Sequence, residues 1–152
     1  MTGIYHAPYF RPTAEALLAL EVPHGFVVQG VEGFGELWLH RPTKFMEARA
    51  GRVEEKTIVP QDLGFATRAS WESEHARDAK AQAQWTERVL AGERGPAHDG
   101  ACLNAGVKLF WGGQASSAEE GIAMAREKLE AGDALRKLRE FVKWTGGSYE
   151  GS

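Results

Sequence analysis

Cysteine is nearly absent from this sequence. Cys102 is the only cysteine among the 152 residues, so the chain holds no internal disulfide framework, and a reducing compartment is expected. Cys102 stands among apolar positions of an expected helix. That setting favours a buried, inert thiol over a nucleophile.

Other features are missing as well, and each absence excludes a class of protein. No apolar run approaches the roughly 20 residues that a transmembrane helix needs, and the N-terminus has no signal-peptide pattern, so we expect a cytoplasmic protein. No G-x-S-x-G elbow supports serine hydrolase chemistry. The five histidines show no zinc-like spacing and no second cysteine could join them. The formal net charge of -3 gives no general attraction to nucleic acid or anionic membranes.

The composition that is present suits one globular domain. Hydrophobic residues make up 43% and charged residues 26% of the chain, which is ordinary for a globular protein. A chain of this length buries roughly two thirds of its unfolded surface. We expect a single α/β domain over residues 1–146 and a flexible tail over residues 147–152.

The clearest helix signals lie between residues 95 and 138. Gly95-Pro96 and Gly112-Gly113 bound a first helix, whose apolar residues recur at helical spacing. A third helix is expected from Asp133 onward, after Gly132 ends the second. The second helix begins with a capping box, for which two pairs qualify: Ser117 with Glu120, or Ser116 with Glu119.

Strand signals dominate the first half of the chain. A helix is expected to begin at Pro12-Thr13, followed by a buried strand over residues 25–29 and a further strand over residues 36–40. Residues 43–49 and 52–59 flank Ala50-Gly51, a two-residue turn of the kind that closes a hairpin. A loop and then a helix are expected within residues 68–90.

These elements predict an α/β (or α+β) fold. Its small mixed β-sheet has about four strands, including the hairpin, and is packed by helices from the N-terminal segment and the C-terminal three-helix stretch. The predicted core consists of Phe26, Val28, Leu37, Leu39, Leu103, Val107, Ile122, Leu129, Leu135 and Leu138.

Two patterns are candidate binding sites. Gly30, Gly33 and Gly35 could present backbone N–H groups to a phosphate, but a strand follows them where a dinucleotide fingerprint has a helix, so a turn is favoured. The last helix carries a basic stripe at positions i, i+3 and i+7: Arg136, Arg139 and Lys143. Such stripes contact nucleic-acid phosphates, although the acidic net charge favours an ordinary solvated face.

An ordered set of short motifs carries a family resemblance. It includes Gly3-Ile4-Tyr5-His6, Phe26-Val27-Val28-Gln29-Gly30 with Glu32-Gly33, Pro42-Thr43, Gly51, Pro60, Asp62, Gly64, Asp99, Leu103-Asn104-Ala105, Leu109, Gly113, Ser117, Glu119-Glu120-Gly121, Ala125-Arg126, Gly132, Ala134-Leu135 and Leu138. This set resembles the C-terminal half of anthranilate phosphoribosyltransferase, of glycosyltransferase family 3. The resemblance covers nearly the whole chain and only that half of the enzyme.

The resemblance implies a reaction, and it also implies that part of the enzyme is missing from this chain. In the family, anthranilate joins phosphoribosyl pyrophosphate with release of pyrophosphate, assisted by Mg²⁺. The family's GTGGD-type phosphate loop, its anthranilate-binding residues and most of its dimer-forming helical domain lie upstream of the similar segment, and no such loop occurs here. We therefore expect a truncated or partial chain that is inactive alone. The alternatives are one subunit of a split transferase, or a non-catalytic nucleic-acid-binding module derived from the fold.

One metal-binding feature of the family is only half present. The family's Asp-Glu pair, which holds magnesium, falls on Gly35 and Glu36, so Glu36 keeps its carboxylate while glycine replaces the aspartate. Glu32 can supply the missing carboxylate if the loop folds back. The alternative is that Glu36 is an ordinary exposed residue at the entry to a strand.

The expected partners follow from the missing half. A sheet cut from a larger domain leaves an edge or a face unpaired, and such edges invite association. We therefore expect either a homo-oligomer or pairing with the missing N-terminal and helical half.

Overall fold

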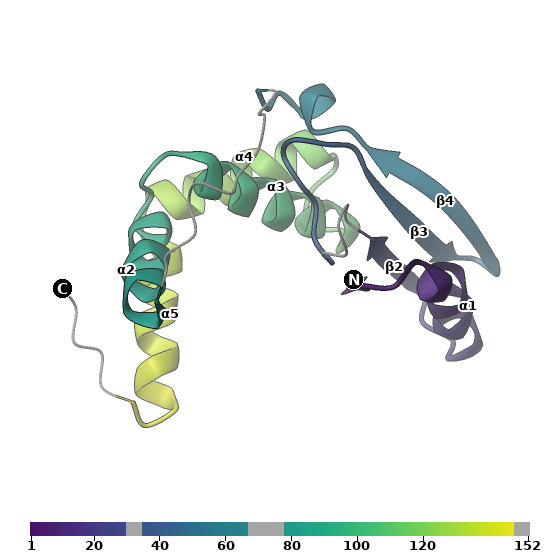
Figure 1. Cartoon of the computed structure of the whole chain (residues 1–152), viewed down its shortest axis with the longest axis horizontal. Coiled ribbons are helices and arrows are strands. Elements are labelled where there is room, and N and C mark those ends of the chain that lie inside the picture. Colours follow the sequence, from purple (N-terminus) through teal and green to yellow (C-terminus); the bar gives the residue numbers. More distant parts are fainter. Residues whose placement is uncertain (30–34, 67–77, 148–152) are drawn as a thin grey trace. The chain divides into compact units, whose positions relative to one another are not determined.

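The computed structural model describes residues 1–29, 35–66 and 78–147. These residues fall into two compact units, divided between Ala69 and Ser70, and each is described by itself (Figure 1). The single domain expected over residues 1–146 stays a prediction. The tail expected from residue 147 lies outside the described residues, apart from Gly147.

The N-terminal unit is a mixed four-stranded sheet with one helix. Its elements are β1 (Thr2–Gly3), α1 (Phe10–Ala19), β2 (His24–Gln29), β3 (Thr43–Arg49) and β4 (Arg52–Ile58), with 3-10 turns at Ala7–Tyr9 and Pro60–Leu63. The strand order is β1-β2-β3-β4. β1 pairs parallel with β2, and the other two pairs are antiparallel. The predicted α/β class with a small mixed sheet is confirmed.

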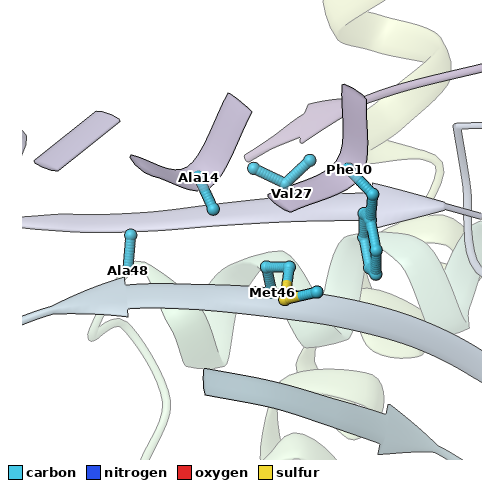
Figure 2. Close-up of a cluster of buried hydrophobic side chains, with 5 residues drawn as sticks. All are labelled: Phe10, Ala14, Val27, Met46 and Ala48. Carbon is cyan, nitrogen blue, oxygen red and sulfur yellow. The ribbon is translucent and has the colours of Figure 1, made fainter. Parts of the chain in front are cut away.

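Helix α1 covers one face of the two central strands. Strand residues alternate between the two faces of a sheet, so Val27 of β2 and its partner Met46 of β3 point to the same side. Figure 2 shows five buried side chains gathered between α1 and these strands: Phe10, Ala14, Val27, Met46 and Ala48. A β-carbon at Gly25 would lie 2.7 Å from Cδ1 of Leu17, so glycine lets the helix approach closely.

The hairpin turns where the sequence predicts. Arg49 and Arg52 are paired across the strands, which leaves Ala50-Gly51 as a two-residue turn. Both turn residues have positive φ, 49° at Ala50 and 77° at Gly51. This is the pattern of a type I′ turn, whose twist matches that of the flanking strands.

Two expectations for the first half of the chain are corrected. Helix α1 begins at Phe10 rather than at Pro12, because proline is tolerated anywhere in the first turn, where N–H groups lack helical partners. Residues 36–40 form no strand. Leu37 and Trp38 are both buried in succession, which a strand with one packed face does not allow.

The C-terminal unit is helical. It contains α2 (Ala79–Leu90), α3 (Pro96–Trp111), α4 (Ala118–Glu130) and α5 (Asp133–Trp144), and Figure 1 shows α3 running beside α4, and α2 beside α5. The helix expected in the second half of residues 68–90 is α2. Of the two serines that could cap α4, Ser117 is the N-cap, because its Oγ accepts a hydrogen bond from the Glu120 N–H at 3.2 Å.

Helices α3 and α4 meet at two glycines. A β-carbon at Gly106 would lie 2.4 Å from the Ile122 nitrogen, and one at Gly121 would lie 2.2 Å from the Gly106 carbonyl oxygen. The backbones therefore touch without side chains between them. Around this crossing Leu103, Val107 and Ile122 are buried.

Most of the predicted core is confirmed. Seven of its ten residues are buried, and the three that are only half-buried are Leu39, Leu135 and Leu138. Leu39 is half-buried because its segment is not a strand of the sheet. No helix in the described part of the chain is long and apolar enough to span a bilayer.

Candidate functional site

The segment that carries Glu36 is fixed by a backbone contact between two glycines. A β-carbon at Gly35 would lie 2.6 Å from the Gly3 Cα, and one at Gly3 would lie 2.3 Å from the Gly35 carbonyl oxygen. Gly3 is itself held in β1, next to an Ile4 N–H that donates to the Val28 carbonyl at 3.0 Å. Only glycine at both positions permits this approach.

Side chains, rather than a strand ladder, hold the residues that follow. The Trp38 N–H donates to Thr43 Oγ1 at 3.3 Å, and Gln61 Nε2 donates to the Leu39 carbonyl at 3.1 Å. The Trp38 ring meets the His40 ring edge-on at 4.9 Å between centroids. The segment is an anchored loop, with Glu36 at its exposed start.

Among the described residues of this segment, Glu36 is the carboxylate that could contact a magnesium ion. Glu36 contributes one exposed carboxylate, and its neighbour Gly35 contributes none. Throughout the described ranges no group of three or more His, Cys, Asp or Glu residues converges as a metal site. Mg²⁺ is usually held by one or two carboxylates together with substrate phosphates, and Glu32, the proposed second carboxylate, lies outside the described residues.

The glycine loop is only partly described. Gly30 and Gly33 lie outside the described residues, so their phosphate contact stays a prediction. Gly35 is half-buried against Gly3. Its close packing explains a glycine at this position without any ligand.

The basic stripe on α5 is partly neutralised within the helix. Arg136 donates to Asp133 at 2.8 Å and to Glu140 at 3.0 Å. Arg139 is exposed and also has an interaction partner, and Lys143 is exposed. Because two carboxylates balance Arg136, the stripe offers less free charge than its spacing indicates, and nucleic-acid binding stays a prediction.

Two buried polar side chains on α3 were not singled out as a pair from the sequence. His98 and Cys102 are one helical turn apart and nearly inaccessible, with Cys102 Sγ 3.8 Å from His98 Nδ1. Burial raises the pKa of the Cys102 thiol, against the opposing effect of Arg126. A raised pKa keeps the thiol protonated and a poor nucleophile, which agrees with the inert role expected for it.

A charged cluster on the sheet was also missed. Glu47 of β3 lies 2.6 Å from His24 Nε2 of β2 and is hydrogen-bonded by Lys56 of β4. Burial raises the pKa of the Glu47 carboxyl, but the hydrogen bonds from Lys56 and His24 outweigh burial, and the pKa is lowered. The cluster occupies the sheet face opposite α1, because Glu47 alternates with Met46 and Ala48.

Comparison with known proteins decides the family. The sequence model described as the glycosyl transferase family, a/b domain, matches residues 1–135. The chain belongs to this family. Among glycosyl transferase family relatives, the anthranilate phosphoribosyltransferase of Rubrobacter xylanophilus is 39% identical over 144 residues, and that of Nitrosomonas europaea is 35% identical over 147 residues.

Solved structures agree with this assignment. The anthranilate phosphoribosyltransferase of Thermus thermophilus is 32% identical, with a TM-score of 0.76, and the match covers 93% of this chain. The enzyme from Saccharomyces cerevisiae in complex with PRPP and Mg has the same fold, with a TM-score of 0.77 at 23% identity. That yeast enzyme binds magnesium together with PRPP.

The chain spans about two-fifths of the length of its relatives. The match covers 94% of this chain but 42% of the Rubrobacter protein, and 41% of the Thermus chain. The part of the family that it corresponds to is the C-terminal portion, as the sequence motifs indicate.

Proposed function

We propose that this chain supplies the C-terminal part of the α/β domain of an anthranilate phosphoribosyltransferase. The reaction transfers the phosphoribosyl group of phosphoribosyl pyrophosphate to anthranilate, releases pyrophosphate and serves tryptophan biosynthesis in the cytoplasm. The observation that carries the proposal is the 39% identity over nearly the whole chain to one such enzyme. The fold shared with the Thermus enzyme supports it independently.

The proposed role of this chain within the enzyme is structural support for the substrate site. The sheet and α1 fix β2, and Gly35 and Glu36 follow β2 in the sequence. No step is assigned to magnesium on the described residues, since they provide the single carboxylate of Glu36 and no second one beside it. The groups that position the pyrophosphate leaving group belong to the remainder of the enzyme.

We propose further that the 152-residue chain is inactive by itself and needs a partner. For activity the partner is a separate polypeptide that supplies the rest of the fold, as in a split transferase. A second copy of this chain is the alternative partner in association. In the nucleic-acid alternative the partner would be an oligonucleotide. This alternative is less favoured, because Asp133 and Glu140 neutralise the charge of Arg136.

An activity assay with a complementing half tests the proposal. The purified chain is mixed with anthranilate, phosphoribosyl pyrophosphate and Mg²⁺, alone and after co-expression with the N-terminal part of the Rubrobacter enzyme. We expect no release of pyrophosphate from the chain alone and measurable release from the complemented pair. Full activity of the chain alone would refute its dependence on a partner, and failure of the two polypeptides to co-purify would refute the split enzyme.

A binding measurement examines Glu36 separately. Calorimetric titration with Mg²⁺ and phosphoribosyl pyrophosphate is run on the chain and on the Glu36→Ala variant. Binding that is lost in the variant would show that the single carboxylate still contributes to a metal–phosphate site. Identical binding in both would remove Glu36 from the site.

A further inference from the structure

Two arginines face each other at the turn end of the hairpin. Arg49 of β3 and Arg52 of β4 are direct partners across the two strands. By alternation along each strand they lie on the same face as Glu47, Glu54 and Lys56, opposite α1. All five charged residues, with Ala50, line a shallow cavity of about 290 Å³.

The carboxylates beside the two arginines are engaged elsewhere. Glu47 is hydrogen-bonded by His24 and Lys56, and Lys56 also lies 3.5 Å from Glu54. Glu47 and Glu54 are themselves directly opposite each other. This like-charged acidic pair is therefore neutralised by a lysine that contacts both members.

Among the described residues, no such group neutralises the basic pair. Within the part of the chain that the structure describes, the side chain of neither Arg49 nor Arg52 forms a hydrogen bond or ion pair, and both side chains are exposed. Like charges directly opposite on a sheet are destabilising. The two guanidinium groups therefore repel each other within one cavity, and a bound anion would reduce that repulsion.

We propose that Arg49 and Arg52 bind an oxyanion of the phosphate class, as inorganic phosphate or a phosphomonoester, in the cavity at the end of the hairpin. The planar guanidinium group offers paired N–H donors that match phosphate oxygens, and two such groups on adjacent strands supply charge and geometry together. The site lies on the β3–β4 hairpin and does not depend on the proposed transferase reaction.

An NMR titration of the full chain tests this site. Inorganic phosphate is added at constant ionic strength, with sodium chloride exchanged for it, and the backbone amides of residues 49–52 and the arginine Nε–Hε groups are followed. We expect saturable shifts confined to the turn end of the hairpin. Absent or linear, non-saturating shifts would overturn the proposal.

Matched variants assign the binding to the two arginines. Arg49→Gln and Arg52→Gln each remove a like-charge repulsion, so both variants should keep the fold, and each should weaken phosphate binding about tenfold because a charge-assisted hydrogen-bond donor is lost. The control is Lys44→Gln, which removes an exposed cation that lies on the other face of β3 and is paired with Glu55 at 2.7 Å. Equal affinity in all variants, or binding of an acidic peptide at this site without any binding of phosphate, would contradict the proposal.

Discussion

At the scale of single residues, the packing of Gly35 decides whether a side chain fits at this position. Its carbonyl and Cα are in backbone contact with Gly3, so any side chain at position 35 displaces β1 or the loop. An aspartate at position 35, where the resemblance places one, therefore does not fit here without a backbone shift. The loss of that carboxylate is built into the packing of this chain.

This contact leads to a prediction for substitutions at position 35. Gly35→Ala and Gly35→Asp should each lower the free energy of unfolding by about 2 kcal/mol, because overpacking against backbone forces the chain to move. Chemical denaturation measures the effect. Glu36→Ala, at the exposed neighbour, serves as the control and should change stability by less than about 0.5 kcal/mol. An unchanged denaturation midpoint for Gly35→Ala would contradict the close contact.

Asp133 gives a pH-dependent prediction. Hydrogen bonds from Arg136 and Lys128 lower the pKa of its carboxyl from 3.8 to about 2. A lowered pKa in the folded state stabilises the fold fully above 3.8, and this stabilisation is lost as the pH falls towards about 2. Asp133→Asn should therefore unfold at a lower temperature than the parent at neutral pH, and the difference should vanish at the acid end of that window.

Salt provides the control for the Asp133 prediction. The Asp133 side chain is partly exposed to solvent, so ions screen its attraction to Arg136 and Lys128. Thermal unfolding at high salt should shrink the difference between the parent and Asp133→Asn at neutral pH. A difference that persists unchanged into acid would mean that the aspartate acts through some other contact.

At the scale of elements, the hairpin turn contains one residue that fits its conformation poorly. Ala50 has a φ of 49°, where its β-carbon is unfavourable, whereas Gly51 at 77° is unstrained. Ala50→Gly should raise the free energy of unfolding by about 1 kcal/mol, since it relieves that strain. The reciprocal variant, Gly51→Ala, should lower it by a similar amount although no atom lies within 4 Å of the added carbon. Changes of the same sign in both variants would exclude this turn geometry.

The elements that the sequence predicts well are those specified locally. Helices α3, α4 and α5 begin and end at glycine, proline and serine signals within a few residues, and the hairpin follows from Ala50-Gly51. The strand expected over residues 36–40 was wrong because a strand requires a partner, and its backbone bonds instead go to Thr43 and Gln61.

The candidate site was less predictable because its contacts are not local. The contact of Gly35 with Gly3 depends on how β1 lies beside β2, and no pattern in the sequence specifies it. The bond between His24 and Glu47 joins residues that are 23 positions apart. The facing pair Arg49 and Arg52 is different, since a two-residue turn at Ala50-Gly51 already places these two residues opposite each other.

At the scale of the whole chain, the exposed edges and faces determine how it associates. The outer strand β4 carries Glu54, Glu55 and Lys56 in succession, and charged edges resist pairing with other sheets. β1, at the other side of the sheet, has only two residues. Association through a sheet edge is therefore the weaker of the two routes expected from the sequence.

Helix α5 offers the stronger route. Phe141 is 58% exposed and Trp144 is 84% exposed, and their spacing of three residues puts them side by side on the helix surface. Large apolar side chains exposed together mark interaction surfaces. We propose that the occupant of this surface is the remainder of the enzyme or, in the isolated chain, a second copy.

Sedimentation velocity over a range of protein concentrations tests this route. The isolated chain should form dimers at high concentration, and the double variant Phe141→Gln with Trp144→Gln should remain monomeric, because burial of the two aromatic rings drives the association. The control is Leu20→Gln, which removes an apolar side chain that is 74% exposed in the N-terminal unit and should leave the dimer intact. A monomer at every concentration would refute association of the isolated chain, and a dimer that survives the double variant would place the interface away from α5.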